Sequence, residues 1–149
     1  MTTASAPLRP GRGILYLVTA AYLAFIAWLT LGPQPTNPST RGFFDSVIAV
    51  VNSVVPSLGF DYNDLEFLGN IAIFVPIGFL FVAIFGRRFW WVALLIGVAM
   101  TCSIEWTQEY LPTRVPDIRD IIANSTGTVI GVLLAIAAGF LRRAKRTRR

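Results

Sequence analysis

Long apolar stretches separated by short polar segments run through the whole chain. Four of them cover residues 14–31, 65–85, 89–110 and 118–141. Each approaches the roughly 20 residues that a helix needs to cross the hydrocarbon core of a bilayer. We therefore predict an all-α membrane protein with four transmembrane helices, folded as a single domain over residues 1–149 with a basic tail at 142–149.

A shorter segment between the first and second stretches has a different pattern. In RGFFDSVIAVVNSVV, residues 41–55, apolar positions recur at close to 3.6-residue spacing. The segment is too short to cross a bilayer as a helix. We predict an amphipathic helix on the outer membrane surface, with a partly inserted hairpin as the alternative.

The composition supports a membrane protein and narrows the chemistry. Hydrophobic residues make up 54% of the chain and the mean hydropathy is +0.62, well above the values of soluble domains. Cys102 is the single cysteine and there is no histidine. These counts exclude an intrachain disulfide, imidazole-based zinc sites and Ser-His or Cys-His catalysis. The sequence assigns no catalytic residue, no metal ligand and no cofactor.

Basic and acidic residues are separated along the chain. Ten of the 13 basic residues would lie on one side of four spans: Arg9, Arg12, Arg87, Arg88, Arg142, Arg143, Lys145, Arg146, Arg148 and Arg149. All eight acidic residues would lie on the other side. Because Lys and Arg in short loops stay in the cytoplasm, we predict a multi-pass protein of the cell membrane with both termini cytoplasmic. The basic tail then contacts anionic lipid headgroups and no nucleic acid.

Polar residues are concentrated around the connection between the third and fourth spans, in SIEWTQEYLPTRVPDIRDIIANSTG at residues 103–127. Polar groups within a membrane usually face a bundle interior or a wet cavity. At the rise of an α-helix, Asn70, Glu105 and Asn124 would all lie roughly 7 to 11 Å below the outer helix ends, in one layer. The candidate ligand-binding residues are Asn70, Glu105, Gln108, Arg114, Asp117, Arg119, Asp120 and Asn124.

Some of these polar residues have structural explanations. Asp117 could cap the fourth span, and Asp120 would interact with its positive end. Asn63, followed three residues later by Glu66, resembles a capping box at the start of the second span. Glu105 and Asn124 lie too deep for a capping role, so their structural alternative is hydrogen bonding between helices.

Small residues recur every four positions in the last span. They are Ala123, Gly127, Gly131 and Ala135. Such a stripe predicts a close approach by another helix.

Two segments, LEFLGNIAIFVPIGFL and EWTQEYLPTRVPDIRDIIANSTGTVIG, resemble the VanZ-like family, which is named for a teicoplanin-resistance protein. The matching positions are Asn70, Phe74, Pro76, Gly78, Phe79, Glu105, Gln108, Arg114, Asp117, Asp120, Asn124, Gly127 and Gly131. The resemblance implies a small integral membrane protein of the cell envelope. In the founding member it implies a link to reduced glycopeptide susceptibility.

Two functional hypotheses follow from the polar cluster. In the first, a noncatalytic envelope protein binds a lipid headgroup or a lipid-linked cell-wall precursor, with Arg114 and Arg119 contacting phosphate or carboxylate. In the alternative, a membrane enzyme acts on a lipid-linked envelope substrate, with Glu105 and Asp117 or Asp120 holding Mg²⁺ or exchanging protons. We expect membrane lipids as partners, and a homo-oligomer is compatible with either hypothesis. Transport is a weaker third alternative, because four helices are few for a monomeric pathway.

The charge separation predicts a labelling pattern. Cysteines introduced at Thr36 and Thr113 should react with a membrane-impermeant thiol reagent in intact cells, and one at Thr147 should not. Labelling at Thr147 alone would reverse the predicted orientation.

Overall fold

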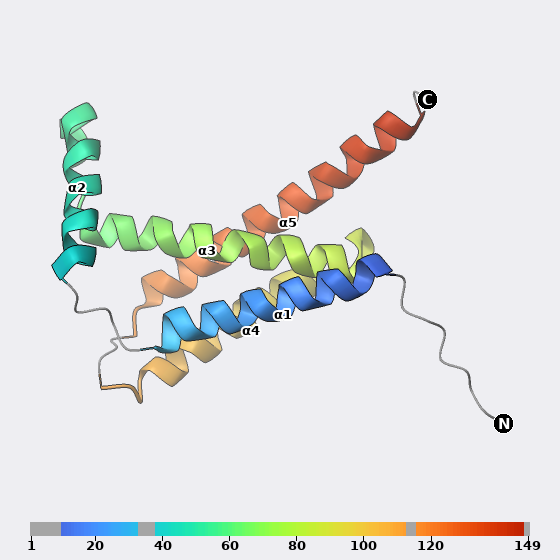
Figure 1. Ribbon diagram of the computed structural model, residues 1–149, viewed down its shortest axis with the longest axis horizontal. Coiled ribbons are helices and arrows are strands. Elements are labelled where there is room, and N and C mark those ends of the chain that lie inside the picture. The colour runs from blue at the N-terminus through green and yellow to red at the C-terminus, as the bar shows by residue number, and fades with distance from the viewer. Residues whose placement is uncertain (1–9, 33–37, 113–115, 148–149) are drawn as a thin grey trace.

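In the computed structural model, four long helices pack side by side and a fifth lies across one end of them (Figure 1). The structure describes residues 10–32, 38–112 and 116–147. The helices are α1 (Pro10–Leu31), α2 (Pro38–Val54), α3 (Tyr62–Phe85), α4 (Trp90–Gln108) and α5 (Ile118–Thr147), with short 3-10 turns η1 (Pro56–Leu58) and η2 (Arg87–Phe89). No strand occurs in these ranges, so the all-α prediction is confirmed.

Four segments are long and apolar enough to cross a membrane. They are Arg12–Leu31, Tyr62–Phe85, Arg87–Gln108 and Ile118–Leu141. The four predicted spans are therefore confirmed. The third span, α4, ends at Gln108, two residues before the predicted boundary. The chain turns there through a hydrogen bond from the Tyr110 N–H to the Thr107 carbonyl.

The contact between α3 and α5 is the most extensive in the bundle. A Cβ atom added to Gly127 would overlap the Ile71 carbonyl oxygen, and one added to Gly131 would overlap the Val75 carbonyl oxygen. On the opposite side of the contact, Gly78 of α3 meets the α5 backbone in the same way. The two backbones therefore touch, which confirms the close approach predicted from the small-residue stripe.

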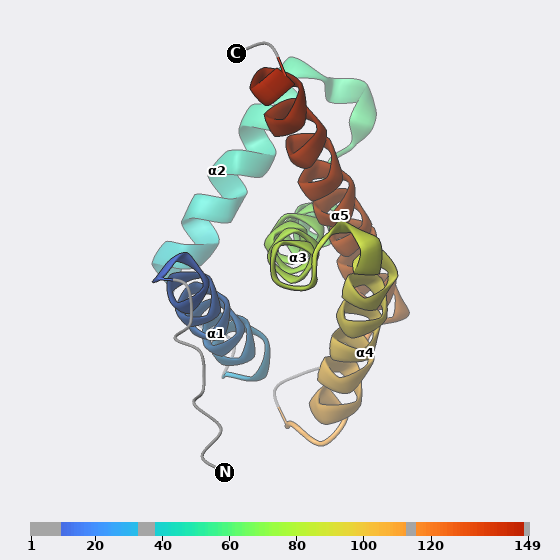
Figure 2. The same ribbon diagram turned by 90° about the vertical axis from the view of Figure 1, so that its right-hand side faces the viewer.

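The remaining helices attach to this pair. Figure 2 shows α3 nearly end-on, with α1 on one side and α4 and α5 on the other. On α4, Gly97 leaves room for the side chain of Thr128 on α5. On α1, the Tyr22 hydroxyl donates a 2.7 Å hydrogen bond to the Ile73 carbonyl of α3, and Ile26 is buried against α3 and α4.

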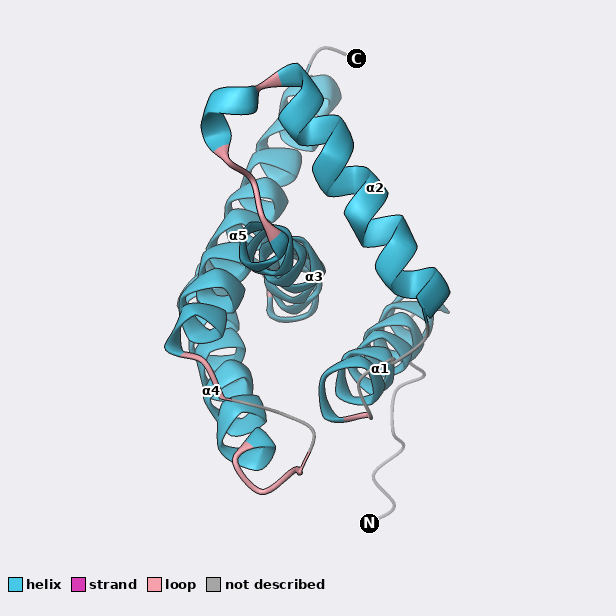
Figure 3. Ribbon diagram, turned by 90° about the vertical axis from the view of Figure 1, so that its left-hand side faces the viewer, coloured by secondary structure: helices cyan, strands magenta, loops and turns pink. Residues whose placement is uncertain are grey.

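The α2 helix lies across the end of the bundle at which α3 begins (Figure 3). Its Asn52 side chain donates to the Phe60 carbonyl at 2.8 Å and accepts from the Phe60 N–H at 2.9 Å. The Phe44 and Tyr62 rings meet edge to face, with centroids 5.9 Å apart. The predicted helix between the first two spans is confirmed, and its location on the outer surface stays a prediction.

The start of α3 differs from the predicted capping box. Asp61 is the capping residue: its carboxylate accepts the Asp64 N–H at 3.0 Å, and Asp64 accepts the Asp61 N–H at 3.1 Å. The prediction of an Asn63–Glu66 box was wrong, because Asp61 and Asp64 form the capping box and α3 already begins at Tyr62. Glu66 is thereby left without a capping role.

The glycine contact predicts a difference between two matched substitutions. Gly131→Ala should lower the free energy of unfolding by about 1–3 kcal/mol, because the added methyl group overpacks a backbone contact. Gly69→Ala on α3, where nothing lies within 4 Å of the added atom, should change it by less than about 1 kcal/mol. Unfolding in detergent measures both variants, and equal midpoints would contradict the close-contact role of Gly131.

Candidate functional site

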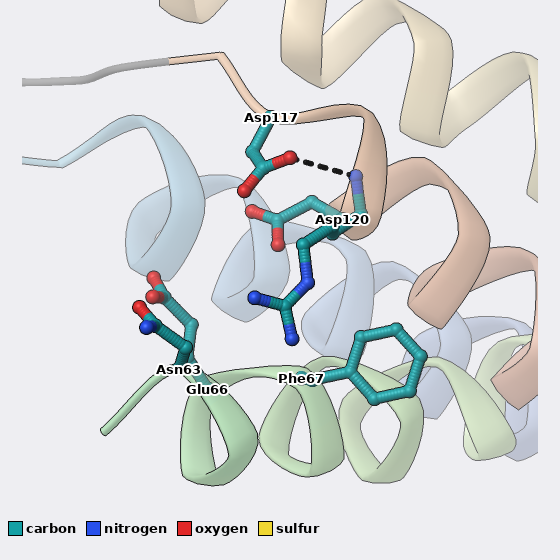
Figure 4. A pocket seen from close by; sticks show the side chains of 6 residues that line it. Asn63, Glu66, Phe67, Asp117 and Asp120 are labelled. Atoms are coloured by element: carbon teal, nitrogen blue, oxygen red, sulfur yellow. Dashed lines mark hydrogen bonds between the residues drawn. The ribbon is translucent and has the colours of Figure 1, made fainter. Parts of the chain in front are cut away.

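A small polar cleft lies where α3 and α5 begin (Figure 4). It is lined from α3 by Asn63, Glu66 and Phe67, and from the α5 end by Asp117, Arg119 and Asp120. Its volume is about 20 Å³, which is room for roughly one water-sized group. Only a small chemical group, such as an ammonium or one oxygen of a phosphate, fits inside.

The α3 side of the cleft is one helical face. Asn63, Glu66 and Phe67 follow each other at the i, i+3 and i+4 spacing that places side chains on the same side of a helix, and Asn70, at i+7, is on that face without lining the cleft. Asn63 and Phe67 were not among the predicted site residues, and Glu66 was predicted to resemble part of a capping box. Their shared face with Asn70 was the signal that could have found them.

The α5 side of the cleft is a helix N-terminus. The Asp117 carboxylate accepts the Arg119 N–H at 2.8 Å, so the predicted capping role of Asp117 is confirmed. Asp120 lies in the first turn. Both carboxylates are at the positive end of the α5 dipole, which stabilises their negative charge.

Glu105 ties α4 to this same N-terminus. Its side chain is 7% exposed, and its Oε2 atom accepts the backbone N–H of Asp117 at 2.8 Å. Asp117 and Asp120 are close enough to interact with it electrostatically. The structural alternative for Glu105, hydrogen bonding between helices, is thus confirmed, because Glu105 of α4 accepts a backbone N–H that has no partner within α5 itself.

Asn124 lies one turn deeper than Glu105. Its Nδ2 atom donates to the Thr101 hydroxyl at 2.9 Å, and Thr101 is one helical turn, about 6 Å, from Glu105 along α4. The two helices α4 and α5 are thus antiparallel neighbours, and Asn124 lies level with Thr101, so the prediction of one layer for Glu105 and Asn124 was wrong. The Asn124 Oδ1 atom is buried without a hydrogen-bond partner.

Gln108 and Asn70 are not among the residues that line the cleft. Gln108 is 6% exposed and donates from Nε2 to the Thr30 carbonyl at 2.9 Å, which joins the ends of α4 and α1. Asn70 is half-buried on α3. Arg114 falls outside the residues that the structure describes.

Charges of both signs meet at the mouth of the cleft. The Arg119 Cζ atom is 5.8 Å from the centroid of the Phe67 ring. The pKa of the exposed Asp61 carboxyl lies below its ordinary value, mainly because the Asp64 N–H donates a hydrogen bond to it, and the Arg119 charge acts in the same direction. Arg119 therefore lies in an acidic surrounding and remains at the surface.

The carboxylates do not assemble into a metal-binding group. Within residues 10–32, 38–112 and 116–147, no set of three or more Asp, Glu or Cys side chains is placed to hold a metal ion. The metal-dependent enzyme hypothesis thus has no ligand set in that part of the chain.

Four apolar spans and a polar cleft at one end define a multi-pass helical membrane protein. The VanZ/LLP1 family model matches residues 15–141, and the chain belongs to that family. The family resemblance drawn from the motifs is thereby confirmed. No curated protein and no solved structure matches the chain.

Two substitutions of Glu105 distinguish the effect of its negative charge from the effect of its hydrogen bond. Glu105→Gln should leave the unfolding midpoint nearly unchanged, since the amide oxygen can still accept the Asp117 N–H. Glu105→Ala should lower the free energy of unfolding by about 1–3 kcal/mol, because that N–H loses its acceptor. Glu109→Ala, at an exposed position, is the control. Equal destabilisation by Gln and Ala at position 105 would show that the negative charge is what holds α5.

Proposed function

We propose that this protein is a noncatalytic membrane protein of the cell envelope that binds the polar headgroup of a lipid at the cleft between α3 and α5. The observation that carries the proposal is the meeting of Arg119 with Asn63, Glu66 and Asp120 at one end of the spans. That end corresponds to the headgroup layer of a bilayer. Charged residues at such positions commonly mark ligand pathways.

The chemistry of the cleft suits a headgroup that carries more than one kind of polar group. A guanidinium binds phosphate or carboxylate through paired N–H donors, and Arg119 supplies one at the mouth. Glu66 and Asp120 can accept hydrogen bonds from hydroxyl or ammonium groups. Since the cavity holds about 20 Å³, the ligand would place one terminal group inside and the rest at the opening.

Contacts around the cleft hold its two sides, α3 and α5, in a fixed relative position. Glu105 fixes Asp117, the residue just before α5, against α4, and the glycine contact fixes α5 against α3. A preorganised site loses less free energy on binding than one that must first be ordered. This arrangement favours a binding role over a purely structural one for the polar residues that line the cleft.

Lipid-linked cell-wall precursors are the ligand class that we favour. They combine phosphate with sugar hydroxyl and amino groups, and the cleft offers partners for each. On the predicted orientation the cleft opens at the outer membrane surface, where glycopeptides act. Retention of a precursor there would change glycopeptide susceptibility, including susceptibility to teicoplanin.

Lipids that co-purify with the full chain test this proposal. Arg119→Gln and Glu66→Gln should each reduce a lipid class enriched with the wild type by about tenfold, because a hydrogen bond to a charged group contributes roughly 1.5–3 kcal/mol. Glu109→Gln also removes an acidic charge, but lies outside the cleft, and should retain the lipid. Mass spectrometry of the bound lipids measures the enrichment. Identical lipid profiles in all four proteins would refute headgroup binding at the cleft.

A further inference from the structure

The opposite end of the bundle contains an arginine held in an unusual way. The chain turns from α3 into α4 at Gly86, with φ of 87°, and η2 packs against the end of α5. There the Cζ atom of Arg87 lies 3.7 Å from the centroid of the Phe140 ring. A Cβ atom on Gly139 would come within 2.8 Å of the Arg87 Cδ atom. Glycine at position 139 therefore leaves room for the aliphatic part of the Arg87 side chain.

This packing fixes the guanidinium group. Arg87 is half-buried, and its Nε atom is buried without a hydrogen-bond partner. Arginines at membrane boundaries usually extend freely toward water. Stacking on a ring uses the face of the guanidinium plane, whereas its terminal N–H donors point outward within that plane and stay open to an anion.

The protein supplies no acidic side chain at this end. Residues 1–44, 67–104 and 121–149 contain neither Asp nor Glu, and these ranges include the α3–α4 turn and the end of α5. The acidic residues of the chain lie between 45 and 66 and between 105 and 120, toward the cleft. The helices at this end therefore offer Arg87 no Asp or Glu side chain as an ion partner.

Exposed aromatic residues place Arg87 at the depth of lipid headgroups. Phe89, Trp90 and Trp91 lie two to four residues after it in the sequence and are 45%, 45% and 50% exposed. Tryptophans at the end of a membrane span gather at the boundary between hydrocarbon and headgroups. The anions found at that depth are the phosphates of the lipids.

We propose that Arg87, stacked on Phe140, forms a specific site for the phosphodiester of an anionic glycerophospholipid. The site is separate from the cleft at the other end of α3 and α5, and it does not depend on the function proposed for that cleft. It also differs from diffuse attraction to the basic tail, because it depends on the position of one guanidinium and not on net charge. Arg88, whose Cζ atom is 5.9 Å from the Phe89 ring, is exposed and adds charge without a fixed geometry.

Charge-conserving substitutions separate the two kinds of binding. The full chain, purified in neutral detergent, is titrated with a short-chain phosphatidylglycerol. Arg87→Lys should weaken binding about tenfold, because lysine keeps the charge but loses the paired donors and the planar stack. Phe140→Leu should weaken it by a similar factor, while the matched control Arg88→Lys should stay within about twofold of the wild type. Equal affinities of the wild type, Arg87→Lys and Phe140→Leu would overturn the proposal, because diffuse charge then accounts for the binding.

Competition and stability measurements complete the test. Phosphatidylglycerol should bind at least about tenfold more tightly than inorganic phosphate, and equal affinities would overturn the assignment of a lipid phosphodiester. If Arg87→Lys or Phe140→Leu unfolds, Gly139→Ala decides the matter, since its methyl group displaces Arg87 without removing a charge or a ring. Loss of binding in folded Gly139→Ala supports the site, and unchanged binding overturns it.

Discussion

The rest of the structure depends on the backbone contact between α3 and α5. Within a bilayer the hydrophobic effect does not hold helices together, so close packing and hydrogen bonds must do so. Gly78, Gly127 and Gly131 let the two helices touch along their backbones. Because the helices run in the same direction, their first turns meet at one end and form the cleft. A side chain at any of these glycines would separate those first turns.

Polar side chains near the ends of the spans mostly satisfy backbone groups of neighbouring helices. Glu105 accepts the Asp117 N–H, and Gln108 donates to the Thr30 carbonyl. An unpaired backbone group is costly in lipid, and each of these bonds removes part of that cost. Part of the polar cluster thus holds the helices together, and the residues that line the cleft are the ones left for the proposed ligand.

The sequence predicted the helices better than it predicted the cleft. Hydropathy gives the spans directly, because a bilayer requires about 20 apolar residues per helix, and the stripe around Gly131 gave the close contact. The roles of Glu105 and Glu66 depended on where α5 and α3 begin. The Asp61–Asp64 capping box sets the start of α3 two residues before the predicted one, and the bond between Glu105 and Asp117 forms only once α4 and α5 pack together.

The two ends of the α3–α5 pair show how one residue type serves different environments. At the cleft, Arg119 of α5 lies 5.8 Å from the Phe67 ring of α3, is exposed and has acidic neighbours. At the other end, Arg87 lies 3.7 Å from the Phe140 ring of α5, is half-buried and has no acidic side chain nearby in the sequence. The charge of a guanidinium among carboxylates is partly neutralised by them, so such a site suits a ligand that carries both positive and negative groups. A guanidinium stacked on a ring without a carboxylate keeps its full charge for an anion, so the charge asymmetry that predicts the topology also predicts a different ligand at each end.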